Sequence, residues 1–240
     1  MCGLSARTAP MEAIPMRLTP RDPRETGREY ALRTIKDNIV RLELAPGSFV
    51  SENELAAEMG LSRTPVREAL IELAKVKIIE ITPQKRSVVA YIDYDMVEEA
   101  RFMRNVLECA VVELACQKAL VSQILQLENN VQLQRFHLEH GNYGGIMELD
   151  IQFHELLFQI AQKPQVYTMI QHISIHFDRV RNMALGSVKD MNIVEDHAQI
   201  VEALMNRDAE KARTIMEQHL NRYKFDEQAI REAYPQYFHT

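Results

Sequence analysis

The stretch SENELAAEMGLSRTPVREALIELAKV restricts the fold of this 240-residue chain most strongly, because it encodes two short helices separated by only a few residues. Ser51 can cap the first helix, and Glu54 stands three residues later, which is the spacing of a capping box. Gly60 can end that helix in a left-handed conformation. Ser62 or Thr64 can cap the second helix, so the stretch predicts a helix-turn-helix pair.

The segments on either side of this pair extend the pattern. The preceding segment, YALRTIKDNIVRLEL, places Leu32, Ile35, Ile39 and Leu42 at helical spacing before APGS stops the helix. The following segment, KIIEITPQKRSVVAYI, is rich in β-branched residues around PQKR, which predicts a β-hairpin. A helix, a helix-turn-helix pair and a hairpin follow one another in the order of a winged helix-turn-helix domain.

After residue 93 the apolar residues recur only at helical spacing, and short connectors such as HGNYGG and NRD predict antiparallel neighbours. Helices are expected at about 95–119, 121–140, 144–162, 165–186, 189–206 and 208–232. The expected fold class is mainly α, with an N-terminal winged helix-turn-helix domain followed by an all-α antiparallel helical bundle.

Composition suggests three parts. Residues 1–26 contain four prolines without sustained periodicity and are expected to form a flexible N-terminal arm. Residues 27–92 would form the winged domain, and residues 93–240 the helical domain. Residues 1–92 hold 14 Lys and Arg against 12 Asp and Glu, whereas residues 93–240 hold 14 against 22. This asymmetry is compatible with a first part that faces nucleic acid.

The composition also predicts a cytoplasmic protein. No apolar run approaches ~18 residues, so we expect no membrane span. The first ten residues, MCGLSARTAP, do not read as a secretory leader. The three cysteines form no C-x-x-C pair, and such a sparse, odd count fits a reducing compartment.

The second helix of a helix-turn-helix pair enters the major groove and reads base edges with its N-terminal residues. Here those residues are Ser62, Arg63, Thr64 and Arg67, and arginine forks suit guanine edges and phosphates. In the hairpin, Lys85 and Arg86 would add positive charge for backbone phosphates. The alternative is a surface helix with solvated arginines, but the complete order of elements favours DNA binding.

Polar side chains interrupt the apolar stripes of three expected bundle helices. In IMELDIQFHELLFQIAQ, Asp150 and His154 lie four residues apart on the buried face, and His197 and His219 lie on the apolar faces of two later helices. A single core histidine is more often a satisfied hydrogen-bonding residue than a ligand. Four inward polar groups from three helices are together better explained by one divalent cation, which would also stabilise the Asp150 anion.

Three imidazoles and one carboxylate leave coordination positions open on a five- or six-coordinate ion, and such positions receive water or a ligand. Arg104, on the apolar side of its helix, is the first candidate partner for an effector carboxylate. The alternative is that Arg104 pairs with Glu108 four residues later. Weaker candidates are Arg101, Arg179 and Arg181.

The segment APGSFVSENELAAEMGLSRTPVREALIEL resembles the DNA-binding domain of the GntR superfamily of transcriptional regulators, over about residues 30–90. The resemblance implies that Arg63, Thr64 and Arg67 contact operator DNA and that a dimer binds an inverted repeat. Three positions depart from the family pattern. Lys77 and Arg86 stand where the family usually has glycine, and Asn53 stands where close relatives often have arginine.

The second half is similar to the FCD ligand-binding domain of the FadR-type branch of that superfamily. RNVLECAVVELAC, DIQFHELLFQIA, EDHAQIVEAL and MEQHL match its motifs over about residues 95–222. All four metal-ligand positions are retained, and family members with that set bind Zn, Ni or similar ions and sense small carboxylates or sugar acids. The resemblance therefore implies a metabolite-responsive regulator, usually a repressor, and not an enzyme.

Two alternatives stay open at this stage. A metalloenzyme could use the open metal positions to activate water, but the sequence offers no clear general base and no Glu-x-x-His pairs of a di-iron bundle. A metal-free sensor of long acyl chains would not need the four ligands. The fused DNA-reading domain argues against the first alternative, and retention of all four ligands argues against the second.

Overall fold

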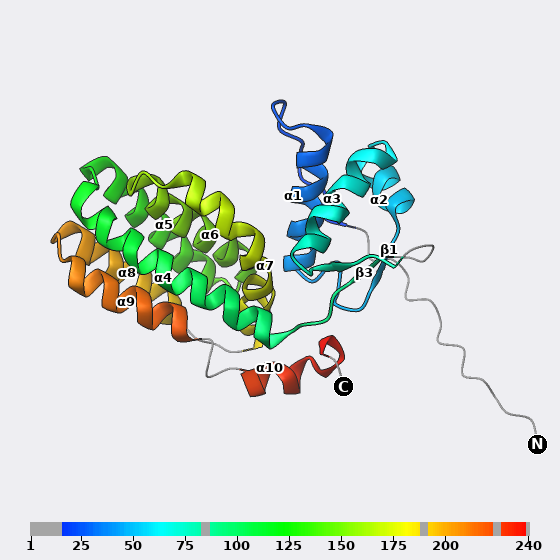
Figure 1. Ribbon diagram of the computed structural model, residues 1–240. Coiled ribbons are helices and arrows are strands. Elements are labelled where there is room, and N and C mark those ends of the chain that lie inside the picture. The colour runs from blue at the N-terminus through cyan, green and yellow to red at the C-terminus, as the bar shows by residue number, and fades with distance from the viewer. Residues whose placement is uncertain (1–15, 83–86, 188–191, 223–226, 239–240) are drawn as a thin grey trace, which may run out of the picture.

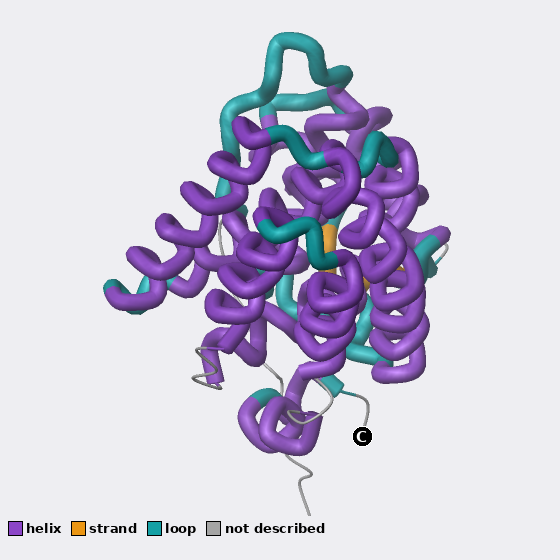
Figure 2. The backbone as a smooth tube through the Cα atoms, turned by 90° about the vertical axis from the view of Figure 1, so that its left-hand side faces the viewer, coloured by secondary structure: helices purple, strands orange, loops and turns teal. Residues whose placement is uncertain are grey.

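The computed structural model describes residues 16–82, 87–187, 192–222 and 227–238. Two domains follow one another along the chain, a winged helix-turn-helix domain and a helical bundle (Figure 1). Helices make up almost the whole fold (Figure 2). The predicted fold class is therefore confirmed. The PQKR segment, with Lys85 and Arg86, lies outside the described residues, as does most of the expected arm.

The winged domain contains three helices and a small antiparallel sheet in the order β1-β3-β2. Its elements are α1 Gly27–Val40, β1 Phe49–Val50, α2 Glu52–Met59, α3 Arg63–Lys75, β2 Ile79–Glu80 and β3 Ser87–Val89. Ser51 caps α2 through the amide of Glu54, and Gly60 ends it in the left-handed conformation, as the sequence predicts.

Two details of this domain differ from the sequence expectation. The first helix ends at Val40 instead of continuing to Leu44, because Leu42 adopts a left-handed conformation with φ +64°. The sheet also has a third strand, β1, in which Phe49 pairs with Val88. A two-residue strand is too short to produce a period-2 pattern, so periodicity alone does not reveal it.

Residues 16–26 pack on the winged domain instead of forming a free arm. The Met16 side chain is buried in the core, and its backbone amide donates to Glu58 Oε1 at 2.6 Å. The Arg17 amide donates to Asn38 Oδ1, and Asn38 Nδ2 donates back to the Arg17 carbonyl. These paired bonds tie the segment to α1, so the packed domain begins near Met16.

The bundle contains six helices among the described residues, and α4 lies centrally against α6, α7 and α9 (Figure 1). These helices are α4 Tyr94–Lys118, α5 Val121–Glu139, α6 Tyr143–Ile160, α7 Pro164–Ser187, α8 Asn192–Met205 and α9 Ala209–Asn221. The bundle core is built on side chains with no solvent exposure, including Phe153, Phe158, Leu204 and Met216. The expected helix over 208–232 is two helices, because α9 ends at Asn221 and α10 covers Glu227–Ala233.

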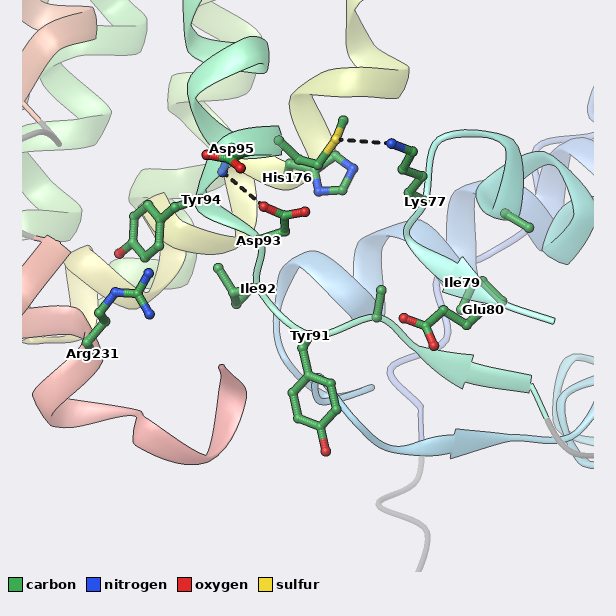
Figure 3. A pocket seen from close by; sticks show the side chains of 13 residues that line it. Lys77, Ile79, Glu80, Tyr91, Ile92, Asp93, Tyr94, Asp95, His176 and Arg231 are labelled. Atoms are coloured by element: carbon green, nitrogen blue, oxygen red, sulfur yellow. Dashed lines mark hydrogen bonds between the residues drawn. The ribbon is translucent and has the colours of Figure 1, made fainter. Parts of the chain in front are cut away.

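The C-terminal segment holds the linker between the domains. α10 and a 3-10 turn, Pro235–Tyr237, follow the bundle, and the Ile92 amide donates to the Tyr237 carbonyl at 2.9 Å. Tyr94 stacks on Phe238, and the Arg231 guanidinium lies over both rings. The close-up in Figure 3 shows Arg231 and Tyr94 at the linker, beside a surface pocket of about 560 Å³.

Two buried α7 side chains bind the backbone of the other domain and of the linker. His176 Nε2 donates to the Val76 carbonyl at 2.7 Å, just beyond α3. Arg179 Nη1 donates to the Ala90 carbonyl at 2.7 Å, and Arg179 Nη2 lies 3.4 Å from His176 Nδ1. Apolar packing continues across the same junction, since Ile175 and Ile39 belong to one core. α7 therefore joins the bundle to the DNA-reading domain.

Acid should weaken this junction through His176. Burial, with a smaller contribution from the Arg179 cation, lowers the pKa of His176 from 6.5 to about 4. The unfolded chain therefore binds the proton first, so the stabilising contribution is present above pH 6.5 and is lost as the pH falls toward 4. A shift of that size corresponds to about 3 kcal/mol. His176→Gln keeps a donor for Val76 without titrating.

We expect urea unfolding of wild type and His176→Gln, measured from pH 7 to 4.5, to show a shallower loss of stability in the variant. Parallel curves for the two proteins would contradict this assignment. His172→Gln is the matched control, because His172 lies one turn earlier on α7, is exposed, and has its Nδ1 at the carbonyl of Thr168 on its own helix.

Candidate functional site

The bundle core brings together the four side chains that the sequence singled out. α6 supplies Asp150 and His154, α8 supplies His197, and α9 supplies His219. All four are buried, with at most 2% of each residue exposed. One potential ligand atom from each residue lies within 4.8 Å of the others, which is a spacing that one metal ion can bridge.

The three imidazoles direct Nε2 toward the centre of this cluster. His154 Nε2 and His219 Nε2 are 3.2 Å apart. His154 Nε2 lies 3.8 Å from Asp150 Oδ2, and His197 Nε2 lies 3.7 Å from Asp150 Oδ1. His197 Nε2 is buried and has no hydrogen-bond partner among the described residues. An orphaned buried nitrogen that faces a carboxylate and two other imidazoles is the arrangement of an N/O metal site.

The outer nitrogens of the same rings face acceptors. His154 Nδ1 contacts Glu108 Oε2, and His219 Nδ1 lies 3.5 Å from Asp196 Oδ2. His197 Nδ1 donates to the side-chain oxygen of Gln134 at 2.8 Å. An acceptor at Nδ1 favours the tautomer that carries its proton there, which leaves the Nε2 lone pair free. Three lone pairs that converge repel one another unless a cation lies between them.

Further contacts fix these acceptors in place. The side chain of Gln134 donates to Asn130 Oδ1 at 2.7 Å, and Asn130 donates to the Leu149 carbonyl, one residue before Asp150. Asp196 binds the Arg222 guanidinium through both oxygens, at 2.5 and 2.7 Å. Held acceptors of this kind orient metal ligands.

The charges of the cluster suit a cation. Burial alone would raise the pKa of Asp150, but the Arg181 cation holds it below its ordinary value. Arg181 Nη1 lies 2.6 Å from Asp150 Oδ2, so this arginine compensates the buried carboxylate. Burial lowers the pKa of His197 and His219, which keeps both rings neutral and able to donate a lone pair.

A cavity of about 100 Å³ lies beside His154. Arg104 and Arg181, two of the candidate effector residues, line it together with Ser174 and Tyr167. Arg104 also makes the predicted pair with Glu108, at 2.6 Å, and its guanidinium lies over the Phe177 ring. The remaining lining side chains are Lys36, Asp37, Val40, Glu108, Ile151, Ile170, Gln171 and Asp178.

The other two candidate arginines lie elsewhere. Arg101 binds Glu98 and donates to Asn221 Oδ1, and it lines a different surface pocket. Arg179 binds the linker carbonyls at the domain junction. Both arginines are on the helices that the pattern predicts, but helical spacing does not reveal which neighbour an arginine reaches.

The supporting residues Gln134 and Asp196 were missed in the sequence analysis. Gln134 follows Leu127 and Val131 at positions i+7 and i+3 of the α5 apolar stripe and has no solvent exposure. An amide in such a stripe is a signal of a buried hydrogen bond. Asp196 directly precedes His197 on α8 and is 3% exposed. Only the fold shows that its side chain faces His219, which belongs to α9.

The DNA-reading candidates form an exposed group at the N-terminus of α3. Ser62 precedes the helix, and Arg63, Thr64 and Arg67 are exposed on its first two turns. Arg63 Nε binds Glu52 Oε2 at 2.5 Å with 64% of its side chain exposed, so DNA could displace this weak pair. Lys77, beyond the helix, has φ +58°, a conformation that glycine adopts without strain.

A winged helix-turn-helix joined to a helical bundle is the architecture of a DNA-binding transcriptional regulator. Residues 29–89 match the model of the bacterial regulatory proteins, gntR family, and residues 99–222 match the FCD domain. The chain therefore belongs to the GntR family of regulators with a C-terminal FCD domain. Among the described residues, no helix is long and apolar enough to cross a membrane.

Named relatives agree with this assignment. The chain is 34% identical over 221 residues to the HTH-type transcriptional repressor RspR of Escherichia coli, covering 92% of this chain and 97% of the relative. It is 26% identical over 213 residues to a probable D-xylose utilization operon transcriptional repressor of Paenarthrobacter nicotinovorans, covering 89% and 92%. These relatives are named as regulators or repressors, and this chain is a transcriptional regulator of the same family.

A solved structure shares the fold. E. coli McbR/YncC superposes with a TM-score of 0.75 at 21% identity, covering 89% of this chain and 99% of that chain. At this identity the likeness supports the architecture of both domains.

Proposed function

We propose that this regulator is a metal-dependent repressor whose operator affinity responds to a small carboxylate or sugar acid. The observation that carries the proposal is the convergence of Asp150, His154, His197 and His219, with the orphaned His197 Nε2 at its centre. Zn²⁺ or Ni²⁺ suits this set, since imidazole is a good ligand for both ions. A resident ion would leave coordination positions open for an acid.

The cavity beside His154 is suited to that acid. Arg104 and Arg181 line it, and guanidinium groups bind carboxylates through paired hydrogen bonds. A long acyl chain exceeds a cavity of about 100 Å³, which disfavours an acyl-ligand sensor. The repressor names of two relatives support the repressing sense.

Operator binding would use α3. A homodimer would place one α3 in the major groove at each half of an inverted repeat, with Ser62, Arg63, Thr64 and Arg67 at the DNA. Lys85 and Arg86, in the wing segment, would neutralise phosphates. The bound acid would change the relative placement of the two winged domains and so weaken binding to spaced half-sites.

Arg67→Ala tests the DNA-reading assignment. The substitution should weaken operator affinity by about 1–3 kcal/mol, or roughly 5–150-fold, because an arginine fork to a base edge or phosphate is lost. Fluorescence anisotropy at fixed salt measures the affinity of both proteins for DNA from the promoter region of the gene that encodes this chain. Arg213→Ala is the control, since Arg213 is exposed on α9 and pairs with Glu113. Equal affinity of wild type for promoter and scrambled DNA would reject the proposed function.

A further inference from the structure

The cavity beside the metal cluster is closed on one side by the DNA-reading domain. Its lining includes Lys36, Asp37 and Val40, which belong to α1, whereas the other lining side chains come from the bundle. α1 packs along α7, and Arg41, just beyond the end of α1, pairs with Glu148 of α6 at 3.6 Å. A ligand in this cavity would therefore touch both domains at once.

The α1 side of the cavity presents a cation. Among the described residues Lys36 makes no ion pair within 4 Å, and its half-buried side chain lines the cavity. Burial raises the pKa of Asp37 beside it, and the nearby cations, Lys36 first among them, oppose that shift. The α1 side therefore brings the Lys36 ammonium group to the cavity, next to the Asp37 carboxyl.

The bundle side of the cavity is also positive once a divalent ion is bound. Arg104 and Arg181 face Glu108, Asp178 and Asp150, so the arginines are nearly balanced by carboxylates. The ion adds two positive charges, and the three neutral imidazoles add none. A cationic centre at one end and Lys36 at the other complement a molecule with an anionic group at each end.

We propose that the effector is a small dicarboxylate bound between the two domains, with one carboxylate at the metal and arginine side and the other at Lys36. This inference rests on the proposed function. It adds Lys36 as the group that binds the second carboxylate, and it explains how the bound acid could act on the DNA-reading domain. The acid joins α1 to α6 and α7, so ligand binding and the orientation of the DNA-reading domain are one event.

Calorimetry on the full-length, Ni²⁺-loaded protein tests the proposal with C3 to C6 dicarboxylates and their monocarboxylate counterparts, for example succinate and butyrate. Lys36→Met should weaken dicarboxylate binding by about tenfold or more, the effect of losing a charged hydrogen bond. Monocarboxylate binding should change little. Lys36→Arg should keep most of the affinity. The control is Arg28→Met, on the same helix but paired with Glu72 of α3.

Hydrogen exchange supplies the second readout. Succinate should slow amide exchange in α1 of wild type, because the bound acid holds this helix against the bundle, and should do so much less in Lys36→Met. Equal dicarboxylate affinity in wild type and Lys36→Met, without protection of α1, overturns the interdomain site and leaves metal-dependent acid sensing intact. If no acid of the series binds the metal-loaded protein, the dicarboxylate site is overturned, and so is the small-carboxylate form of the proposed function.

Discussion

Purified His197→Ala and His219→Ala proteins should retain less than about a tenth of a metal ion per chain under conditions where wild type retains one. Each substitution removes one of the three imidazole nitrogens that meet in the buried core of the bundle. His219 Nε2 lies 3.2 Å from His154 Nε2, so His219→Ala removes a nitrogen that lies directly beside another ligand atom. Metal analysis after dialysis against Zn²⁺ or Ni²⁺, followed by exhaustive washing, measures the content.

His172→Ala is the matched control for this experiment. His172 is exposed on α7, and its Nδ1 lies at the Thr168 carbonyl on the same helix, so its loss should leave the metal content unchanged. Glu108→Gln should give an intermediate result. It keeps an acceptor for His154 but loses the charge that raises the basicity of the ring, and such changes cost roughly 10–100-fold in metal affinity. Equal, negligible metal in wild type and all variants would remove the metal from the proposed function.

The sequence made the four converging residues predictable for a physical reason. A helix that packs on a bundle core repeats its apolar positions every 3.6 residues, so a polar residue at such a position must be buried. Asp150, His154, His197 and His219 all occupy such positions. Burying four polar side chains on three helices costs free energy, which one shared cation could offset. The structure brings the four side chains together.

The groups that support the site were less accessible to sequence reasoning. Arg181 and Glu108 each lie on a helix whose neighbours are set by tertiary packing, and helical spacing shows only partners three or four residues away. The spacing therefore predicts the pair of Arg104 with Glu108 but not the contact of Glu108 with His154. The same limit applies to Lys36, because closure of the cavity by α1 depends on how two domains pack.

Left-handed backbone conformations at non-glycine residues were also not predictable from the sequence pattern. The apolar spacing of the first helix continues to Leu42, but that residue adopts φ +64° and the helix stops at Val40. The glycine that usually follows α3 in the family is Lys77 here, and the structure keeps the left-handed conformation with φ +58°. The fold thus imposes on Lys77 a backbone conformation that its side chain disfavours.

Arg181→Met should destabilise the metal-free protein by about 3–5 kcal/mol, because it leaves the buried Asp150 carboxylate without its closest cation. Arg181 Nη1 lies 2.6 Å from Asp150 Oδ2, and the two side chains are 2% and 3% exposed. The metal-loaded variant should lose much less stability, because the ion then compensates the carboxylate. Urea unfolding in a chelator and in excess Ni²⁺ gives both values.

A double substitution separates the charge effect from the loss of packing. In Asp150→Asn with Arg181→Met, the buried charge and its partner disappear together, so the metal-free double variant should be more stable than Arg181→Met alone. The same double variant should gain little from Ni²⁺, since it lacks a ligand. If metal-free Arg181→Met is as stable as wild type, Asp150 is not held as an anion by Arg181. Asp150 would then be buried without a compensating cation, either as the anion or in its protonated form. A resident metal ion would no longer be needed to explain why an aspartate is buried at this position.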